Sequence, residues 1–215
     1  KNGHPSLELE VGPSAKFTAG PVSAGGLAIF GDSGGRLTAF KPDGAKRWTY
    51  AASGSVLGSL TAVDGRLYFG TGDRWFHSLS VAGGKLKWKT RLTGSAAWPV
   101  SVSGRKLVLA TTASVVYCLK KRTGVTKWWR TVRSRVFDRP LVSEGLVFIS
   151  GDIPGIDVLD LISGEAGGRA GFPDYSPGRC RLSALWYSSG RLAALSSGDC
   201  AAGAELMFFA GPRRK

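Results

Sequence analysis

The sequence predicts an all-β fold made of short strands and tight turns. Between residues 64 and 90, three apolar or alternating runs, RLYFG, FHSLSV and KLKWKT, are separated by turns rich in glycine and aspartate. This pattern is typical of consecutive β-hairpins. It recurs with a period near 40 residues and four strand signals per repeat. Such a period predicts a β-propeller, a ring of four-stranded antiparallel sheets called blades.

Tryptophans and turn glycines mark the period. Trp88 closes the stretch above, and Trp48 and Trp128 stand 40 residues before and after it. Glycines of the preceding turn recur with the same spacing; they are Gly44, Gly84, Gly124 and Gly164. Basic residues flank the tryptophans, and strand alternation places these charges on the face opposite the indole ring. We therefore expect the repeat tryptophans to pack between blades.

Counting the repeats predicts a single domain, residues 1–215, with five blades. They are expected at residues 20–50, 59–90, 99–131, 140–170 and 179–211. Gly168 replaces the tryptophan of the fourth blade, and the fifth has only three strand signals. An N-terminal strand, residues 6–11, lacks a hairpin partner before it. We expect it to pair with residues 205–210 and close the ring as the missing strand of the last blade, since closure removes exposed sheet edges.

The charge of the chain favours an acidic partner. Lysine and arginine number 29 against 15 acidic residues, giving a formal net charge of +14. Such an excess attracts anionic surfaces, although solubility and protection of sheet edges are an alternative explanation. The basic residues gather in the second and third blades, where the candidate contact residues are Lys87, Lys89, Lys121 and Arg122. No recognised nucleic-acid motif accompanies them, so nucleic acid is not an expected partner.

The cysteines and the apolar runs bear on the cellular compartment. Cys118 lies within the apolar run VVYCL and is expected to be a buried free thiol. Cys180 and Cys200 flank one expected hairpin and are predicted to form a disulfide, which would indicate an oxidising compartment. Two unrelated thiols are the alternative. The sequence contains no run of about 20 apolar residues, the length of a membrane-spanning helix.

The repeat x-L-Y-F-G-T-x-D, followed by a strand and by G-x-x-x-W, resembles the pyrroloquinoline-quinone-like, or quinoprotein-like, β-propeller repeat. The matching segments are residues 68–73 with Gly84 and Trp88, residues 29–32 with Gly44 and Trp48, and residues 108–112 with Gly124 and Trp128. The resemblance covers about residues 6–211. The family includes quinone-dependent dehydrogenases and cofactor-free scaffolds, such as the outer-membrane-assembly lipoprotein and related bacterial envelope proteins.

The resemblance implies the scaffold branch of this family. The dehydrogenases are much larger, typically have eight blades, and hold a quinone and a calcium ion over the ring axis. This sequence shows neither an adjacent-cysteine pair nor a Glu-Asn-Asp constellation for such a site. We expect no cofactor and no enzyme activity. A quinoprotein-like enzyme fragment is the alternative.

The favoured function is that of a non-catalytic module for protein–protein interaction or structure in a bacterial envelope or extracellular assembly. The protein is expected to be exported and to lie in the periplasm, at the outer membrane or outside the cell. Its expected partner is another protein of a larger assembly with an acidic surface, and an anionic glycan or lipid is an alternative partner.

Few side chains suggest catalysis or metal binding. Turns between the second and third strands carry aspartates at positions 32, 73, 152 and 199. These carboxylates would bind a cation if they faced one mouth of the ring, but hydrogen bonds to nearby turn amides are the favoured interpretation. His77 aligns with Leu37 and Tyr117 at an in-strand position, so we expect it to pack. No Ser/His/Asp set, Cys/His set or metal-ligand spacing is present, and no catalytic or metal residue is expected.

Two tryptophans lie outside the repeat positions. Trp75 stands beside a turn and Trp98 at a strand start. Exposed aromatic side chains mark contact surfaces, so both are candidate partner-binding residues. They also carry the alternative of a carbohydrate-binding, lectin-like propeller, because aromatic rings stack on sugars.

Overall fold

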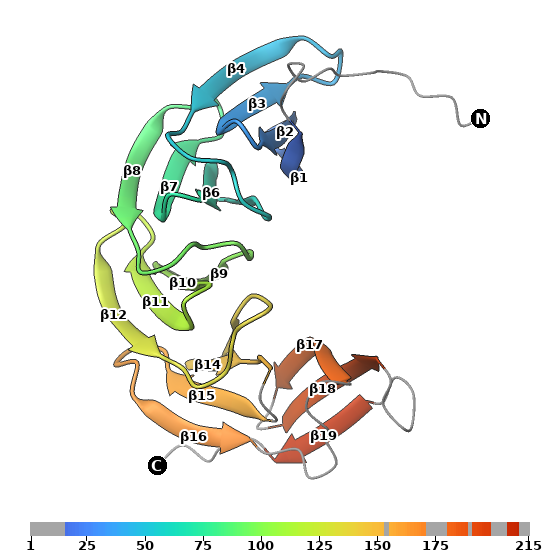
Figure 1. The fold of residues 1–215 in the computed structure, drawn as a ribbon, viewed down its shortest axis with the longest axis vertical. Coiled ribbons are helices and arrows are strands. Elements are labelled where there is room, and N and C mark those ends of the chain that lie inside the picture. The colour runs from blue at the N-terminus through green and yellow to red at the C-terminus, as the bar shows by residue number, and fades with distance from the viewer. Residues whose placement is uncertain (1–15, 153–154, 171–179, 189–190, 199–205, 211–215) are drawn as a thin grey trace, which may run out of the picture. The chain divides into compact units, whose positions relative to one another are not determined.

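The computed structural model describes residues 16–152, 155–170, 180–188, 191–198 and 206–210, and their regular structure consists of β-strands (Figure 1). These strands form four four-stranded sheets and one three-stranded sheet, all with antiparallel neighbours. The all-β, four-stranded antiparallel pattern is therefore confirmed. The closing strand expected at residues 6–11 lies outside the described residues, so closure of a five-bladed ring stays a prediction. The chain divides into two compact units, residues 1–99 and 100–215.

The first unit holds sheets 1 and 2. Sheet 1 comprises β1 (Phe17–Ala24), β2 (Leu27–Asp32), β3 (Arg36–Phe40) and β4 (Lys46–Ala51). Sheet 2 comprises β5 (Thr61–Val63), β6 (Arg66–Gly70), β7 (Trp75–Ser80) and β8 (Leu86–Arg91). Asp64 and Gly65, which join β5 to β6, both have positive φ, at 49° and 68°. Two-residue hairpin turns favour this backbone conformation, which explains why Asp-Gly predicted the turn.

The second unit holds sheets 3, 4 and 5. Sheet 3 comprises β9 (Ser101–Ser103), β10 (Lys106–Ala110), β11 (Val115–Lys120) and β12 (Thr126–Thr131). Sheet 4 comprises β13 (Leu141–Ser143), β14 (Leu146–Ile149), β15 (Ile156–Asp160) and β16 (Ala166–Ala170). Sheet 5 comprises β17 (Cys180–Ser188), β18 (Arg191–Gly198) and β19 (Leu206–Ala210).

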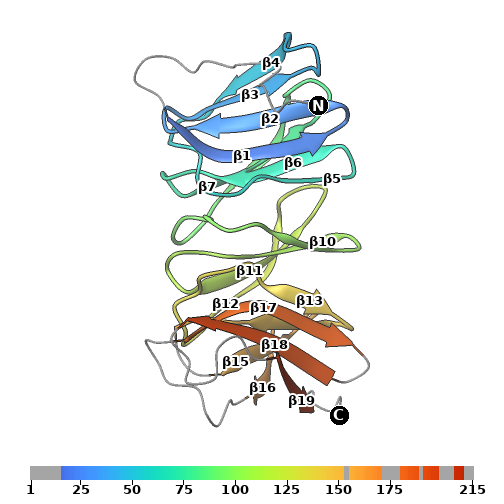
Figure 2. The same ribbon diagram turned by 90° about the vertical axis from the view of Figure 1, so that its right-hand side faces the viewer.

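Within each unit, the first strands of neighbouring sheets lie close together. β1 lies beside β5 in the first unit, and β13 lies beside β17 in the second (Figure 2). β13 also contacts β9. Each four-stranded sheet runs in sequence order from its first strand to its fourth. The fourth strands β4, β8, β12 and β16, called the outer strands below, therefore form the opposite edges of their sheets.

Burial differs between the middle and the outer strands. In β10 and β11 nearly every residue is buried, whereas β8 buries little besides Trp88. A strand covered on both faces reads as a continuous apolar run, and a half-covered strand alternates. The apolar cores lie between sheets: one joins sheets 1 and 2, and another joins sheets 3 and 4. We call these two contacts seam 1–2 and seam 3–4.

Candidate functional site

A tryptophan from β4 anchors seam 1–2. The indole Nε1 of Trp48 donates a hydrogen bond of 2.7 Å to the carbonyl oxygen of Val81, in the turn between β7 and β8. The ring also covers Gly84 of that turn, where a Cβ atom would lie 2.5 Å from Trp48 Cε3. Gly84 has a φ of 63°, a conformation that glycine adopts without steric cost. The close approach and the backbone conformation together require glycine at this position.

Seam 3–4 repeats the same contact. Trp128 Nε1 donates a 3.1 Å hydrogen bond to the carbonyl oxygen of Leu161, and a Cβ on Gly164 would lie 2.5 Å from Trp128 Cδ2. The prediction that repeat tryptophans pack between neighbouring sheets is confirmed at both seams. The 40-residue spacing of tryptophans and turn glycines thus records one contact, in which the tryptophan of one sheet meets the glycine of the next.

A chain of polar side chains crosses seam 1–2. The hydroxyl of Tyr50, on β4, lies 3.3 Å from Nδ1 of His77, and Nε2 of His77 lies 3.4 Å from Thr71 Oγ1. Thr71 donates a 2.5 Å hydrogen bond to Oδ1 of Asp73, and Ser53 donates one of 2.5 Å to Oδ2. These contacts between polar side chains therefore link the last strand of sheet 1, and the residues just after it, to the β6–β7 turn of sheet 2.

Burial fixes the charge states within this chain. His77 is 1% exposed and stacks on Phe69, with ring centroids 4.8 Å apart. Burial, helped by the nearby charge of Lys89, lowers the pKa of His77 to about 4. For Asp73, burial works to raise the pKa, but hydrogen bonds from Ser53 and Thr71 outweigh it and lower the pKa. At neutral pH a neutral imidazole thus lies between two hydroxyl groups, an arrangement that joins two sheets.

The structure confirms that His77 packs within its strand but corrects its alignment. His77 pairs with Lys89 as Tyr117 pairs with Trp129, so those two positions match. Trp48, however, pairs with Ala39 whereas Trp88 pairs with Ser78. The connection from β3 to β4 is therefore one residue shorter, and Thr38 rather than Leu37 occupies the position of His77 in sheet 1.

Two predicted contact residues, one basic and one aromatic, meet on sheet 2. Lys89 Nζ lies 4.6 Å from the centroid of the Trp75 ring, and Arg91 Cζ lies 5.6 Å from it. Strand pairing explains the arrangement, because Trp75 opposes Arg91 while the next residue on that face, His77, opposes Lys89. The structure thus brings Lys89 and Trp75 together. Arg91 completes the cluster; pairing it with Trp75 requires the β7–β8 register, which the repeat pattern alone does not fix.

The other predicted contact residues occupy separate places. Lys87 is exposed on β8. Trp98 is half-buried in the loop that precedes β9, and Trp75 is also half-buried. Lys121 and Arg122 lie in the turn between β11 and β12 of the second unit, where Arg122 is exposed. Whether any of these residues binds a partner stays a prediction.

Two of the three cysteines, Cys180 and Cys200, have side chains that lie outside the described residues. The backbone of Cys180 begins β17 and pairs with Gly198, but Cys200 lies outside the described residues, so the disulfide stays a prediction. Cys118 is a buried free thiol, as expected. Burial raises its pKa to about 11, which keeps the thiol protonated.

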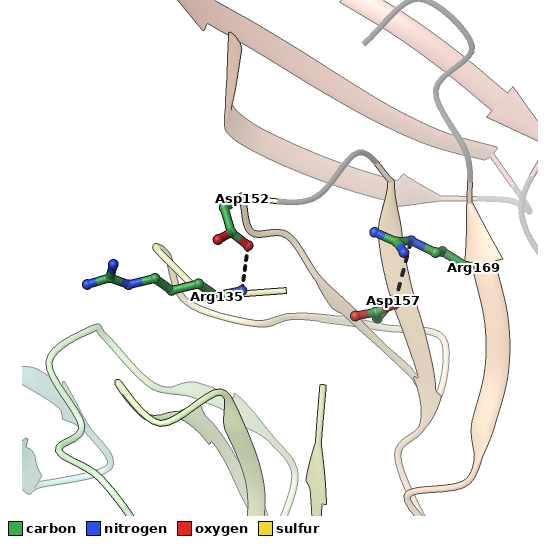
Figure 3. Close-up of polar contacts among 4 residues, drawn as sticks. All are labelled: Arg135, Asp152, Asp157 and Arg169. Atoms are coloured by element: carbon green, nitrogen blue, oxygen red, sulfur yellow. Dashed lines mark hydrogen bonds and ion pairs between the residues drawn. The ribbon is translucent and has the colours of Figure 1, made fainter. Parts of the chain in front are cut away.

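Charged groups take the place of the polar chain in seam 3–4. Asp157 lies on the face of β15 that also carries Leu159, part of the core of this seam. Its Oδ1 lies 3.7 Å from Nε of Arg169, which opposes it on β16 (Figure 3). Its Oδ2 is buried and has no hydrogen-bond partner among the described residues. From β12, Arg130 Nη2 donates a 3.2 Å hydrogen bond across the seam to the carbonyl oxygen of Ser163.

Turn aspartates in the described residues accept hydrogen bonds, each in a different way. Asp32 Oδ1 accepts from the amide of Arg36 at 2.9 Å, within its own turn, as the sequence interpretation expected. Asp152 Oδ1 accepts from the amide of Arg135 at 2.6 Å, in the segment that enters sheet 4 (Figure 3). Asp199 lies outside the described residues. No group of three or more His, Cys, Asp or Glu side chains that could hold a metal ion occurs in the part of the chain that the structure describes.

The described residues form no helix that is long and apolar enough to cross a membrane.

The chain is similar in sequence and fold to known proteins. A family model described as the outer membrane protein assembly factor BamB matches residues 6–100 and 78–166. The crystal structure of BamB from Moraxella catarrhalis is 19% identical, with a TM-score of 0.67, over 91% of this chain and 62% of that chain. The computationally designed protein Ika8 is 12% identical, with a TM-score of 0.68, over the same shares. A comparison with curated proteins gave no match.

The two structural similarities, at these identities, show a shared fold, and this chain spans 62% of the length of both structures. The family model shows membership of a family as well as a fold, because its two matches together extend over residues 6–166 of the 215. They include the repeat tryptophans and glycines that form both seams. The resemblance to quinoprotein-like propeller repeats is confirmed, and the chain belongs to the family of the outer membrane protein assembly factor BamB.

Proposed function

We propose that this protein is a non-catalytic interaction module in a bacterial envelope assembly and that it serves the assembly of outer membrane proteins. Membership of the BamB family carries this proposal. The protein is exported, and its partner is another protein of the assembly with an acidic surface.

The outer strand β8 supports the acidic partner. Lys87, Lys89 and Arg91 are all exposed on it, and none forms an ion pair with a described residue. Surface charges of one sign steer an oppositely charged partner and raise its rate of association. The carbohydrate alternative has less support, because cations lie over the Trp75 ring on which a sugar would stack.

Cross-linking in envelope preparations from the native source tests the proposal. A photoreactive amino acid at position 87 is expected to capture envelope proteins, with a yield that falls steeply between 0.1 M and 1 M salt because the screening length shortens from about 10 Å to about 3 Å. The same label in a variant with Lys121→Glu and Arg122→Glu reports whether the basic residues of sheet 3 contribute. Capture of no envelope protein, or capture that salt leaves unchanged, would contradict the proposal.

A further inference from the structure

Two cations converge on one indole ring at the outer side of sheet 2. Lys89 Nζ and Arg91 Cζ lie 4.6 Å and 5.6 Å from the centroid of Trp75. Tryptophan is the aromatic residue that attracts cations most strongly. Trp75 is half-buried at the start of β7, and both cations lie on the neighbouring strand β8 (Figure 1). Regular strand pairing therefore fixes the three side chains relative to one another.

The positive charge of this cluster is not neutralised within the described residues. Neither Lys89 nor Arg91 forms an ion pair there. Asp73, at the neighbouring turn, accepts hydrogen bonds from Ser53 and Thr71 instead. His77, which opposes Lys89, is neutral at physiological pH, since its pKa is about 4. Two like charges held over one ring without a carboxylate repel each other, and carboxylates bound to them would offset that repulsion.

The spacing of the cations matches that of an extended acidic protein segment. Lys87, Lys89 and Arg91 recur at every second residue and are exposed. Alternate residues of a strand lie roughly 6.5–7 Å apart, which is also the spacing of alternate side chains in an extended acidic segment. The corresponding positions of β4 do not share the pattern, because Arg47 is followed by Thr49 and Ala51. β12 departs from it in the same way, with Lys127 followed by Trp129 and Thr131.

We propose that Trp75, Lys89 and Arg91 form a binding site for an extended acidic segment of a protein partner, in which carboxylates of alternate residues pair with Lys89 and Arg91. Arginine offers a planar pair of N–H donors that matches a carboxylate. The cation–π contacts hold both side chains in place before binding, which reduces the conformational entropy lost on association. Lys87 takes the next acidic side chain along the segment. The site rests on the proposed function for the identity of its partner but not for its chemistry.

A binding assay with the whole chain tests the site. The probe is a capped, fluorescently labelled peptide of alternating glutamate and glycine, followed by fluorescence anisotropy. The double variant Lys89→Gln/Arg91→Gln is expected to weaken binding at least tenfold, and Trp75→Leu several-fold. The matched control is Arg47→Gln, an exposed charge on the outer strand of sheet 1, which is expected to change affinity less than twofold. Because Trp75→Leu also removes packing, the double variant, which changes only exposed side chains, decides the result.

Two further probes separate the sources of negative charge. Vesicles of anionic phospholipid and a sulfated polysaccharide are measured with the same variants. Binding of either one with the same dependence on Lys89 and Arg91, without binding of the peptide, would overturn the assignment to a protein segment. Equal binding of the peptide by the double variant and by the original chain would overturn the site.

Failure of the site and failure of the proposed function give different results. If envelope proteins are captured from position 87 and the double variant captures them equally well, the site is wrong while the function stands. If the peptide binds through Lys89 and Arg91 but no envelope protein is captured, the site stands and the proposed function is wrong.

Discussion

The two seams share one contact and differ beside it. In each, a tryptophan of the outer strand covers the turn glycine of the next sheet and donates a hydrogen bond to a carbonyl of the same turn. Beside this contact, seam 1–2 has neutral His77 opposite Lys89, whereas seam 3–4 has Asp157 opposite Arg169. Tyr50 reaches His77 in the first, and at the corresponding position Arg130 reaches a backbone carbonyl in the second.

This difference shows which part of the repeat holds neighbouring sheets together. The tryptophan–glycine contact excludes a Cβ atom and satisfies the indole N–H, so it allows little variation. The neighbouring position accepts an imidazole in one seam and a carboxylate in the other, each with its own partners. Stability should therefore depend on the tryptophan equally in both seams, while the response to pH and the effect of charge should differ between them.

The largest expected effect is the loss of a repeat tryptophan. Trp48→Ala and Trp128→Ala should each lower the free energy of unfolding by about 3–5 kcal/mol, since both remove a large buried ring and leave a cavity. Denaturant unfolding followed by circular dichroism measures both. Trp129→Ala is the control, because Trp129 is 56% exposed and exposed substitutions usually change stability by less than about 0.5 kcal/mol. A loss at one seam only would break the equivalence of the seams.

The next effect is a pH dependence confined to seam 1–2. The pKa of His77 is about 4 in the folded protein and about 6.5 in an unfolded chain, so the unfolded chain binds more protons between these values. Stability that is fully present above pH 6.5 is therefore lost as the pH falls through 4, by about 3 kcal/mol in all. Urea unfolding at a series of pH values measures the loss.

The charges around His77 keep this window separate from other titrations. Tyr50, which contacts His77, stays neutral across this window because its pKa is raised by burial. The pKa of Asp73 is lowered, so its contribution disappears only below the window of His77. His77→Gln keeps hydrogen-bonding groups but does not titrate, and the loss between pH 6.5 and 4 should vanish in it. An unchanged pH profile in this variant would show that the dependence arises elsewhere.

The sequence predicted the strands and the seam tryptophans but not the partners of His77. Short apolar runs and Asp-Gly turns determine local hairpins, and a fixed spacing of Trp and Gly reports a contact made in every repeat, so both can be read from one chain. The alignment of His77 with Leu37 was wrong because the turn between β3 and β4 is one residue shorter. A shift of one residue moves a side chain to the other face of a strand.

The contact of Trp75 with Lys89 and Arg91 escaped prediction for the same reason, because it depends on how two strands are aligned. Basic and aromatic residues were separate hypotheses in the sequence, because their distance depends on the register of β7 and β8. That register includes an irregularity between Ser78 and Leu79, where the pairing shifts by one residue. The polar chain from Tyr50 to Ser53 depends in addition on two sheets packing against each other, which no local pattern specifies.

The smallest expected effect on stability comes from changing Arg169 or Asp157, the ion pair of seam 3–4, one at a time. Asp157 has one buried carboxylate oxygen without a hydrogen-bond partner among the described residues, and its ion pair with Arg169 is long, at 3.7 Å. A partly buried ion pair of this kind contributes little, whereas removing the arginine alone leaves the less exposed carboxylate uncompensated. Arg169→Met should therefore lower the free energy of unfolding by about 1 kcal/mol, a modest value because the arginine side chain is 29% exposed.

Asp157→Thr, which introduces the residue found at the corresponding position, Thr38, should leave stability unchanged or raise it by up to about 1 kcal/mol. Urea unfolding at neutral pH compares the two, and the double variant should unfold close to the original chain because the uncompensated charge is gone. A loss of 2 kcal/mol or more in Asp157→Thr would mean that the carboxylate holds seam 3–4 together as the polar chain holds seam 1–2.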